Sequence, residues 1–339
     1  MKAYQLCAVN DLRYEECEEP IIKDGWCLVE IKAAGICSSD IPRIYSKGTY
    51  HFPTIPGHEF SGIVKSVKSE KDKHWLNKRV GIFPLIPCKK CEQCNQHHYE
   101  MCLDYDYLGS RRDGGFAEYV AVPIWNLIEL PESLSFEVGA MLEPLAVAVH
   151  AIKKSGVVRG NKVAILGTGM IGFSIAWFAK IYGALDVDVI GRSDSKKKIA
   201  ETLGVHYIST ENEKIEKTYD VVFEAVGSNQ SINSSINIAR PGATLVLLGN
   251  PEGEIRMDQD IYWKILRKQL VLKGTWNSSY ENNSSCDWSE VIGIIAENQA
   301  GAKAMLTHIY PQEELKKGLE LMKEHKTSYC KVMTIWNRG

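Results

Sequence analysis

The stretch KVAILGTGMIG, residues 162–172, joins a short apolar run to the spacing Gly-x-Gly-x-x-Gly and then to a longer apolar segment. A strand, a glycine-rich turn and a helix in that order are typical of a dinucleotide-binding unit. Gly167 permits the tight turn, Gly169 lets the backbone approach a pyrophosphate, and Gly172 lets helix and strand pack closely. An ordinary tight turn between strand and helix is the alternative interpretation.

The region around this turn favours the dinucleotide. Met170 and Ile171 open the helix, whose N-terminus attracts an anion, so both join the three glycines as predicted cofactor-binding residues. Short apolar runs alternate with helical stretches, which predicts parallel βαβ units with both sheet faces covered. The expected strands are 162–166, 187–190, 221–224, 243–248 and 271–273, and the expected helices start at Met170 and Ser195 and near Ser231 and Asp258.

The end of the expected strand 187–190 helps to decide whether NAD or NADP binds. An acidic residue about 20 residues past the glycines normally bonds the ribose 2′-hydroxyl of NAD, but here the strand ends in Gly191 followed by Arg192. Without that carboxylate a 2′-phosphate is not repelled, and Arg192 can pair with it, assisted by Ser193 and Lys196. NADP(H) is therefore favoured. The alternative is NAD(H), with Asp194 turned towards the ribose and Arg192 solvated.

A cluster of cysteines predicts a structural metal site. Of ten cysteines, four share the spacing C-x2-C-x2-C-x7-C in a polar loop: Cys88, Cys91, Cys94 and Cys102. In a reducing compartment such a cluster favours a metal over disulfides. Four thiolates close a tetrahedral zinc shell and leave no open position, which is typical of a structural zinc. His97 and His98 are alternative ligands, but four cysteines already fill the shell.

A second set of ligand types is dispersed along the chain. It comprises Cys37 in GICSSD, His58 and Glu59 in PGHEFSG, and Glu143 in LEPLAVAVHA. A thiolate, an imidazole and carboxylates with room for water suit a catalytic zinc. A lone cysteine or histidine is more often a packed residue, so the interpretation depends on their joint presence with the cysteine cluster and the dinucleotide motif.

These residues predict an alcohol oxidation. A zinc ion binds the substrate oxygen and stabilises the alkoxide from which hydride leaves, and the dinucleotide accepts the hydride. Ser39, two residues after Cys37, is placed to accept the alcohol proton. Asp40 is expected to bond the outer nitrogen of His58 and so to orient it.

The length, composition and net charge of the chain limit the classes of partner that it can bind. The chain of 339 residues exceeds one ordinary domain, and 45% hydrophobic with 24% charged residues is a normal globular mix. A net charge of −2 argues against a nucleic-acid partner. The start of the sequence has no apolar core of signal-peptide length, and no stretch reaches the apolar length of a membrane span, so no membrane partner and a cytoplasmic location are expected.

Taken together, the motifs GICSSD, PGHEFSG, the four-cysteine lobe, GGFAEY, LEP-x5-HA and GTGMIG, in this order, resemble the zinc-containing medium-chain dehydrogenases over essentially the whole chain. The resemblance implies an α/β protein with a β-rich GroES-like catalytic domain over 1–152, to which 290–339 returns, and a Rossmann domain over 153–289. It implies catalytic zinc ligands at Cys37, His58, Glu59 and Glu143, and a homodimer or homotetramer.

Finer features resemble the polyol and polyol-phosphate dehydrogenases of the galactitol-1-phosphate type within that family. They are SSDIPRI, FPTIPGHEFSG, YLGSRRDGGFAEY and KILRKQL…KGTW. A phosphorylated polyol needs cations, and the candidates are Arg43, Lys47, Arg111 and Arg112, with Trp276 as a candidate wall of the substrate site. Alternatively, Arg111 and Arg112 form a solvated turn or an ion pair.

Two competing functions stay open at this point. A threonine-type dehydrogenase is one, but many such relatives carry a proton-relaying histidine five residues after the zinc cysteine, where this chain has Pro42. Another polyol dehydrogenase is a variant of the same interpretation. A dinucleotide-binding relative without catalysis is the second, and its sign would be missing zinc ligands, whereas all four are present.

Overall fold

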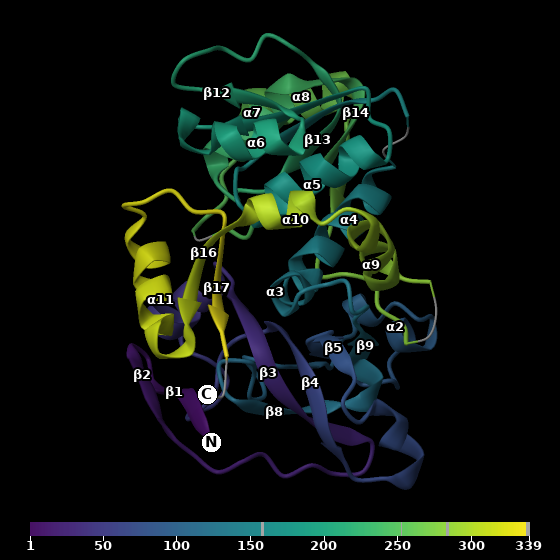
Figure 1. Cartoon of the computed structure of the whole chain (residues 1–339). Helices are drawn as coiled ribbons and strands as arrows, with labels where there is room; N and C mark the ends of the chain where they lie inside the picture. The colour runs from purple at the N-terminus through teal and green to yellow at the C-terminus, as the bar shows by residue number, and fades with distance from the viewer. Residues whose placement is uncertain (157–158, 252, 283–284, 337–339) are drawn as a thin grey trace. The chain divides into compact units, whose positions relative to one another are not determined.

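The computed structural model describes residues 1–156, 159–251, 253–282 and 285–336 of the chain (Figure 1). These residues form two compact units. The first comprises Met1–Glu143 and Ser279–Gly339, and the second comprises Pro144–Ser278. The chain thus leaves its first unit once and returns to it.

The second unit is built on a six-stranded parallel sheet in the order β12-β11-β10-β13-β14-β15. The strand order reverses between β10 and β13, and doubly wound sheets bind ligands at such a switch point, beyond the carboxyl ends of the strands. The predicted doubly wound sheet is therefore confirmed. The strands are β10 (Lys162–Leu166), β11 (Asp186–Gly191), β12 (His206–Ser209), β13 (Tyr219–Glu224), β14 (Ala239–Leu247) and β15 (Val271–Gly274).

Helices connect these strands. They are α5 (Met170–Ile181), α6 (Lys197–Leu203), α7 (Asn229–Ile238) and α8 (Gln259–Lys268). The helix expected from Ser195 begins two residues later, because Asp194–Lys196 form a 3-10 turn first. It ends at Gly204, whose φ of 67° is the left-handed conformation that commonly stops a helix. Apolar side chains of the sheet and of α7 and α8 form one core cluster of this unit, and most of α5 is buried as well.

The first unit contains a larger, mostly antiparallel sheet in the order β16-β17-β3-β4-β5-β9, with β8 also paired to β3. Segments from both ends of the chain therefore share one sheet, because β17 pairs antiparallel with β3. Its strands are β3 (Trp26–Ile36), β4 (Glu59–Val67), β5 (Arg79–Ile82), β8 (Tyr119–Pro123), β9 (Leu127–Glu129), β16 (Leu306–Pro311) and β17 (Lys331–Ile335).

Smaller elements complete this unit. The strand pairs are β1 (Lys2–Ala8) with β2 (Asp11–Glu16), and β6 (Leu85–Ile86) with β7 (Asp106–Tyr107). The helices are α1 (Asp40–Pro42), α2 (Glu92–Asn95), α3 (Phe136–Ala140), α9 (Asp287–Glu297), α10 (Ala300–Met305) and α11 (Leu315–Glu324), while α4 (Leu142–Ser155) begins here and continues in the second unit. Apolar side chains of β1, β3, β4, β8, α11 and β17 share one core.

One strand of this unit starts later than its sequence pattern suggests. The sequence of 116–122 predicts a strand over all seven residues, but β8 begins at Tyr119. The preceding backbone is committed elsewhere, since the N–H groups of Gly115 and Phe116 donate to the carbonyls of Gly57 and Pro56. These bonds hold the segment against the residues that lead into β4.

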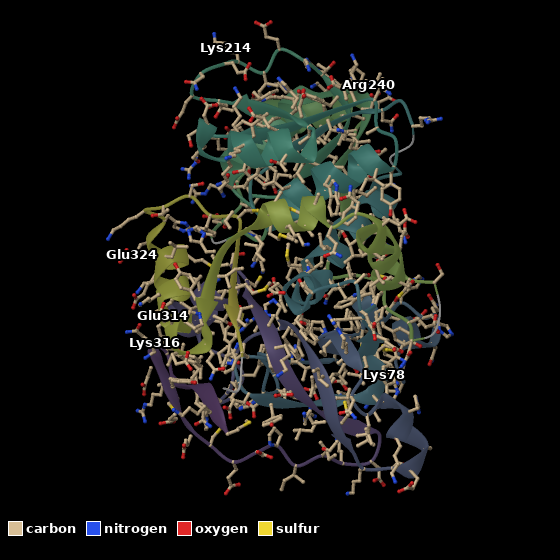
Figure 2. The ribbon with its side chains drawn as sticks, viewed as in Figure 1. Lys78, Lys214, Arg240, Glu314, Lys316 and Glu324 are labelled. Atoms are coloured by element: carbon tan, nitrogen blue, oxygen red, sulfur yellow. The ribbon has the colours of Figure 1, made fainter. Side chains whose placement is uncertain are left out.

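The surface carries charges of both signs. Lys78, Lys214, Arg240, Glu314, Lys316 and Glu324 lie at the periphery of their units (Figure 2). Within the described part of the chain, no helix combines the length and apolar character needed to cross a bilayer.

Candidate active site

The polar loop with four cysteines folds so that its sulfur atoms converge. Cys88 Sγ lies 3.9 Å from Cys94 Sγ, Cys91 Sγ lies 4.0 Å from Cys102 Sγ, and all four sulfurs are within 4.8 Å of one another. A tetrahedral zinc with Zn–S bonds of about 2.3 Å separates its sulfurs by about 3.8 Å. Backbone N–H groups of Leu103 and Cys94 lower the pKa of the Cys91 thiol to about 6, which favours the thiolate that zinc binds.

The two histidines of this loop face carboxylates instead of the sulfurs. His97 Nδ1 lies 2.8 Å from Glu281 Oε1, and His98 Nδ1 lies 3.7 Å from Glu100 Oε1. The donor set that fits a closed zinc shell is therefore the four thiols alone.

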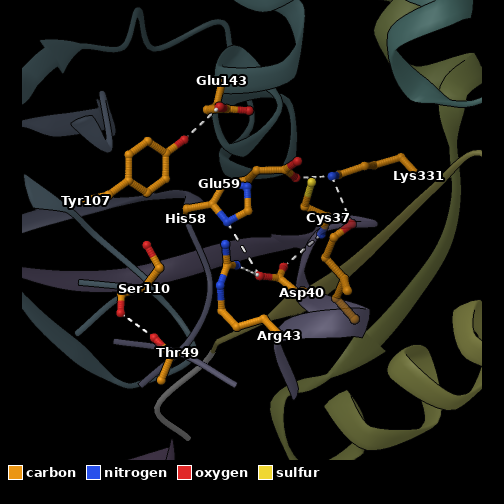
Figure 3. A network of polar contacts seen from close by, with 11 residues as sticks. Cys37, Asp40, Arg43, Thr49, His58, Glu59, Tyr107, Ser110, Glu143 and Lys331 are labelled. Atoms are coloured by element: carbon orange, nitrogen blue, oxygen red, sulfur yellow. Dashed lines mark hydrogen bonds and ion pairs between the residues drawn. The ribbon is translucent and has the colours of Figure 1, made fainter. Parts of the chain in front are cut away.

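A second group of ligand types meets where β3 and β4 pair. Their antiparallel register places Gly35 opposite Glu59. Cys37 follows the end of β3 and His58 precedes the start of β4, so the pairing brings both to the same end of the two strands (Figure 3). The ligand atoms of Cys37, His58 and Glu59 lie within 4.8 Å of one another. A thiol, an imidazole and a carboxylate this close are a donor set that fits a catalytic zinc.

Charge and burial set the protonation of this group. Burial alone would raise the pKa of the Cys37 thiol, but the neighbouring His58 lowers it to about 6. Burial would also lower the pKa of His58, but Asp40 and Cys37 raise it to about 10. The thiolate and the imidazolium thus stabilise each other. A zinc ion bound here would take the place of the imidazole proton, since only the neutral ring can donate a lone pair to a metal.

Asp40 lies behind the histidine, on the side of its Nδ1 atom. It is fully buried and accepts hydrogen bonds from the Cys37 N–H, at 3.0 Å, and from Arg43, at 2.7 Å. Its Oδ1 lies 3.5 Å from His58 Nδ1, a buried atom that has no hydrogen-bond partner among the described residues. With Nδ1 facing Asp40, the other ring nitrogen is left for a metal, which is how carboxylates orient metal-binding histidines.

Lys331 is a member of the site that the sequence analysis missed. It starts β17, is 2% exposed, and pairs through Nζ with Glu59 Oε2 while donating to the Ile36 carbonyl at 3.1 Å (Figure 3). Gly35 makes room for this ion pair, because a Cβ there would lie 2.5 Å from Glu59 Oε2 and 2.7 Å from Lys331 Cε. Burial lowers the pKa of Lys331 to about 8. The only sequence signal was a lysine opening an apolar strand, KVMTI.

Tyr107 is a second residue that the sequence analysis missed. Its hydroxyl donates a hydrogen bond of 3.3 Å to Glu143 Oε1, and its ring lies 5.7 Å from the ring of His58 (Figure 3). Glu143 is not in the compact group of three ligand residues, but burial raises its pKa to about 7, and Cys37 and His58 are close enough to act on it. A cation nearby would keep this carboxylate ionised.

The predicted substrate arginines of one loop have partners within the protein. Arg111 lies between the rings of Tyr50 and Tyr105, at 4.5 and 4.4 Å, and donates to the Tyr105 carbonyl at 2.7 Å. Arg112 forms an ion pair of 2.5 Å with Asp106. These contacts favour the structural interpretation of both residues over a phosphate-binding one.

The other predicted residues are placed as follows. Ser39 is the N-cap of α1 and makes no side-chain cap bond there. Arg43 is held by Asp40, as described above, and Lys47 is exposed at the end of the same helical segment. Trp276, in the second unit, is 62% exposed.

The glycine-rich turn of the second unit has the shape its sequence predicts. Gly167 has a φ of 122°, and a Cβ at Gly172 would lie 2.0 Å from the Gly167 carbonyl oxygen. A Cβ at Gly169 would meet nothing within 4 Å, which leaves open space in front of the turn. The helix α5 begins at Met170 without a side-chain cap, so its first N–H groups are available to an anion. The turn therefore fits a dinucleotide pyrophosphate.

Comparison with known proteins shows the family of this chain. Residues 23–132 match the model of the alcohol dehydrogenase GroES-like domain, and residues 171–297 match that of the zinc-binding dehydrogenases. The chain therefore belongs to the zinc-containing medium-chain dehydrogenases and is an oxidoreductase of that family.

Particular relatives narrow the comparison. The galactitol 1-phosphate 5-dehydrogenase of Escherichia coli (strain K12) is 31% identical over 290 residues, which cover 83% of this chain and 84% of that protein. The crystal structure of galactitol-1-phosphate dehydrogenase from Escherichia coli superposes with a TM-score of 0.91 at 29% identity, over 99% of this chain and 100% of that one. A zinc-binding dehydrogenase from Sinorhizobium meliloti 1021, solved bound to NADP, has a TM-score of 0.85 at 27% identity and covers 98% of both chains.

Proposed function

We propose that this protein transfers a hydride between a secondary alcohol of a polyol or polyol phosphate, of the galactitol-1-phosphate kind, and NADP. The observation that carries the proposal is the convergence of Cys37, His58 and Glu59 within 4.8 Å. The 31% identity to a galactitol 1-phosphate 5-dehydrogenase supports the substrate class. We assign the metal chemistry to residues 1–152 with 290–339 and dinucleotide binding to 153–289. Self-association stays a prediction.

The roles of the residues follow from their positions. Cys37, His58 and Glu143 would hold the catalytic zinc, with Glu59 as a further ligand, and Cys88, Cys91, Cys94 and Cys102 would hold the structural one. When bound, the catalytic zinc supplies a Lewis acid that lowers the pKa of the substrate alcohol. Asp40 orients His58, and Lys331 balances the charge of Glu59. Ser39 Oγ accepts the alcohol proton and passes it to water.

The surroundings of Arg192 support NADP as the cofactor. Arg192 is exposed, directly follows β11, and has no ion pair among the described residues. Asp194, which would have to serve NAD, accepts a hydrogen bond of 2.5 Å from Asn212 Nδ2. Lys196 Nζ donates to the Thr168 carbonyl at 2.9 Å, which brings its charge close to the glycine-rich turn. The segment that follows β11, where a 2′-phosphate is expected, thus carries the cations Arg192 and Lys196, and its carboxylate Asp194 already accepts a hydrogen bond.

Replacing the free arginine tests the cofactor. We expect Arg192→Ala to raise the KM for NADP about tenfold or more, because a charge-assisted hydrogen bond to phosphate is worth about 1.5–3 kcal/mol. The KM for NAD should change little. Lys197→Ala, an exposed cation in the next helix, serves as the matched control. A wild-type preference for NAD in kcat/KM would contradict the assignment.

A substrate panel tests the reaction. We expect turnover with NADP on a sugar alcohol or its phosphate, for example galactitol 1-phosphate, galactitol, sorbitol or xylitol, and none on threonine. Pro42 cannot carry a proton at the position where threonine-type relatives have a histidine. The measurement is the initial rate of NADPH formation for each substrate. Activity on threonine alone would sink the polyol proposal.

A further inference from the structure

We propose that Tyr207 is a specificity-determining residue, which occupies the space that a ribose-binding carboxylate would need at the end of β11. The inference rests on the NADP preference proposed above. The inference goes beyond the cofactor preference in two ways. It explains why β11 ends in a glycine, and it identifies Tyr207 as the residue that must change before a preference for NADP can be reversed.

Strand pairing puts Tyr207 beside the end of β11. The strand β12 runs parallel to β11, with Tyr207 opposite Val189 and Ser209 opposite Gly191. Tyr207 is 6% exposed, and its hydroxyl donates a hydrogen bond of 2.7 Å to the Ser193 carbonyl. The phenol is therefore held at both ends, by packing along its ring and by a hydrogen bond at its tip.

The tip of this side chain fills the space next to residue 191. A Cβ at Gly191 would lie 2.2 Å from Tyr207 Oη, 2.9 Å from its Cζ and 2.7 Å from Thr168 Cγ2. Real Cβ atoms do not approach other atoms this closely, so an aspartate or glutamate at 191 cannot fit without moving the tyrosine. In NAD-binding relatives of this fold, a carboxylate near this position bonds the ribose 2′-hydroxyl. Tyr207 sterically excludes such a carboxylate at position 191. Specificity against NAD would therefore come from a steric clash and not from an added attractive contact.

The same tyrosine helps to hold the loop that carries Arg192. Its hydroxyl fixes the Ser193 carbonyl, while the Arg192 carbonyl accepts from Ser209 Oγ at 3.0 Å and from the Glu211 N–H at 3.0 Å. Both carbonyls of the Arg192–Ser193 pair are thus anchored to β12 or to the residues after it. This backbone anchoring limits the conformations of the free guanidinium and presents it beside the strand end.

The experiment is a double-mutant cycle on the full-length protein between position 191 and position 207. The variants are Gly191→Ala, Gly191→Asp, Tyr207→Met and the two double variants, with Tyr207→Phe as the conservative change. Methionine retains apolar bulk but is flexible enough to yield space. The readouts are the melting temperature without dinucleotide and the dissociation constants of NADPH and NADH from fluorescence titration.

We expect G191A and G191D to lower the melting temperature when Tyr207 is present and to do so less when combined with Y207M, because the closest of the clashes is then relieved and only the contact with Thr168 Cγ2 is left. G191D with Y207M should bind NADH about tenfold more tightly than Y207M alone, whereas G191D alone gains little. Y207F, which removes only the hydrogen bond to Ser193, should weaken NADPH binding a few-fold and leave NADH binding unchanged.

Two results separate the inference from the proposal beneath it. Additive melting-temperature changes at 191 and 207 would overturn the role of Tyr207, whichever dinucleotide the wild type prefers. Tighter binding of NADH than NADPH by the wild type would overturn the cofactor proposal, and the steric coupling would still be read from the melting temperatures.

Discussion

Cys37→Ala is expected to abolish turnover and to remove one of two zinc ions per chain while the four-cysteine site keeps its own. The thiol of Cys37 lies within 4.8 Å of the ligand atoms of His58 and Glu59, and its pKa of about 6 makes it a ready thiolate. Stabilisation of a developing alkoxide by a metal is worth several kcal/mol, so kcat should fall by about three orders of magnitude. Metal content by mass spectrometry and initial rates measure the two effects.

The matched control for this variant is Cys27→Ala. Cys27 is fully buried in β3, and its Sγ contacts the Val122 carbonyl, away from the ligand group. The Cys27→Ala variant should lose some stability but keep both zinc ions and most of its activity. If Cys37→Ala retained two zinc ions per chain and wild-type turnover, the assignment of the catalytic metal to this cluster would be wrong.

Lys331→Met is expected to lower the free energy of unfolding by about 3–5 kcal/mol, because it leaves the buried Glu59 carboxylate without its cation. Both side chains of the pair are 2% exposed, so water cannot replace the lost partner. The main-chain oxygen of Ile36 also loses a donor. Denaturant unfolding of the wild type and the variant, both freed of metal with a chelator, measures the change, because a zinc ion beside Glu59 would itself supply a cation.

A second substitution separates the charge from the packing. Lys331→Met combined with Glu59→Gln removes both charges and should recover a large part of the lost stability, since an uncharged pair is less costly to bury. The exposed control is Lys78→Met, which breaks the pair of Lys78 with Glu129, 45% and 54% exposed. That change should cost at most about 1 kcal/mol. Equal losses in the buried and exposed variants would contradict the role given to Lys331.

Several features of this protein could be predicted from short stretches of sequence. The glycine spacing of GTGMIG demands a turn with a positive φ and a close approach of helix and strand, and Gly167 and Gly172 show both. The cysteine loop converges because its spacing already confines four sulfurs to fifteen residues. The strand and helix alternation predicted the doubly wound sheet, since its period depends on local burial alone.

Other features depended on contacts between distant segments. Lys331 and Glu59 are 272 positions apart and meet because β17 joins the sheet beside β3. Tyr107 reaches Glu143, and Tyr207 reaches the end of β11, through pairings that no local spacing reveals. The partners of Arg111 and Arg112 likewise became visible only when the loops were placed together.

Residue types and short spacings thus determined the chemistry that we propose for this protein: sulfur and imidazole groups for a metal, a turn for a pyrophosphate, and an arginine where an acid is usual. The register of the strands, and the return of the C-terminal segment to the first unit, decided which charged side chains form ion pairs and which stay unpaired. They also decided which positions have room for a Cβ atom. The reason is physical. Ligand chemistry and turn geometry are properties of a few adjacent residues, whereas burial, charge balance and steric exclusion arise only when segments far apart in the chain occupy the same small volume.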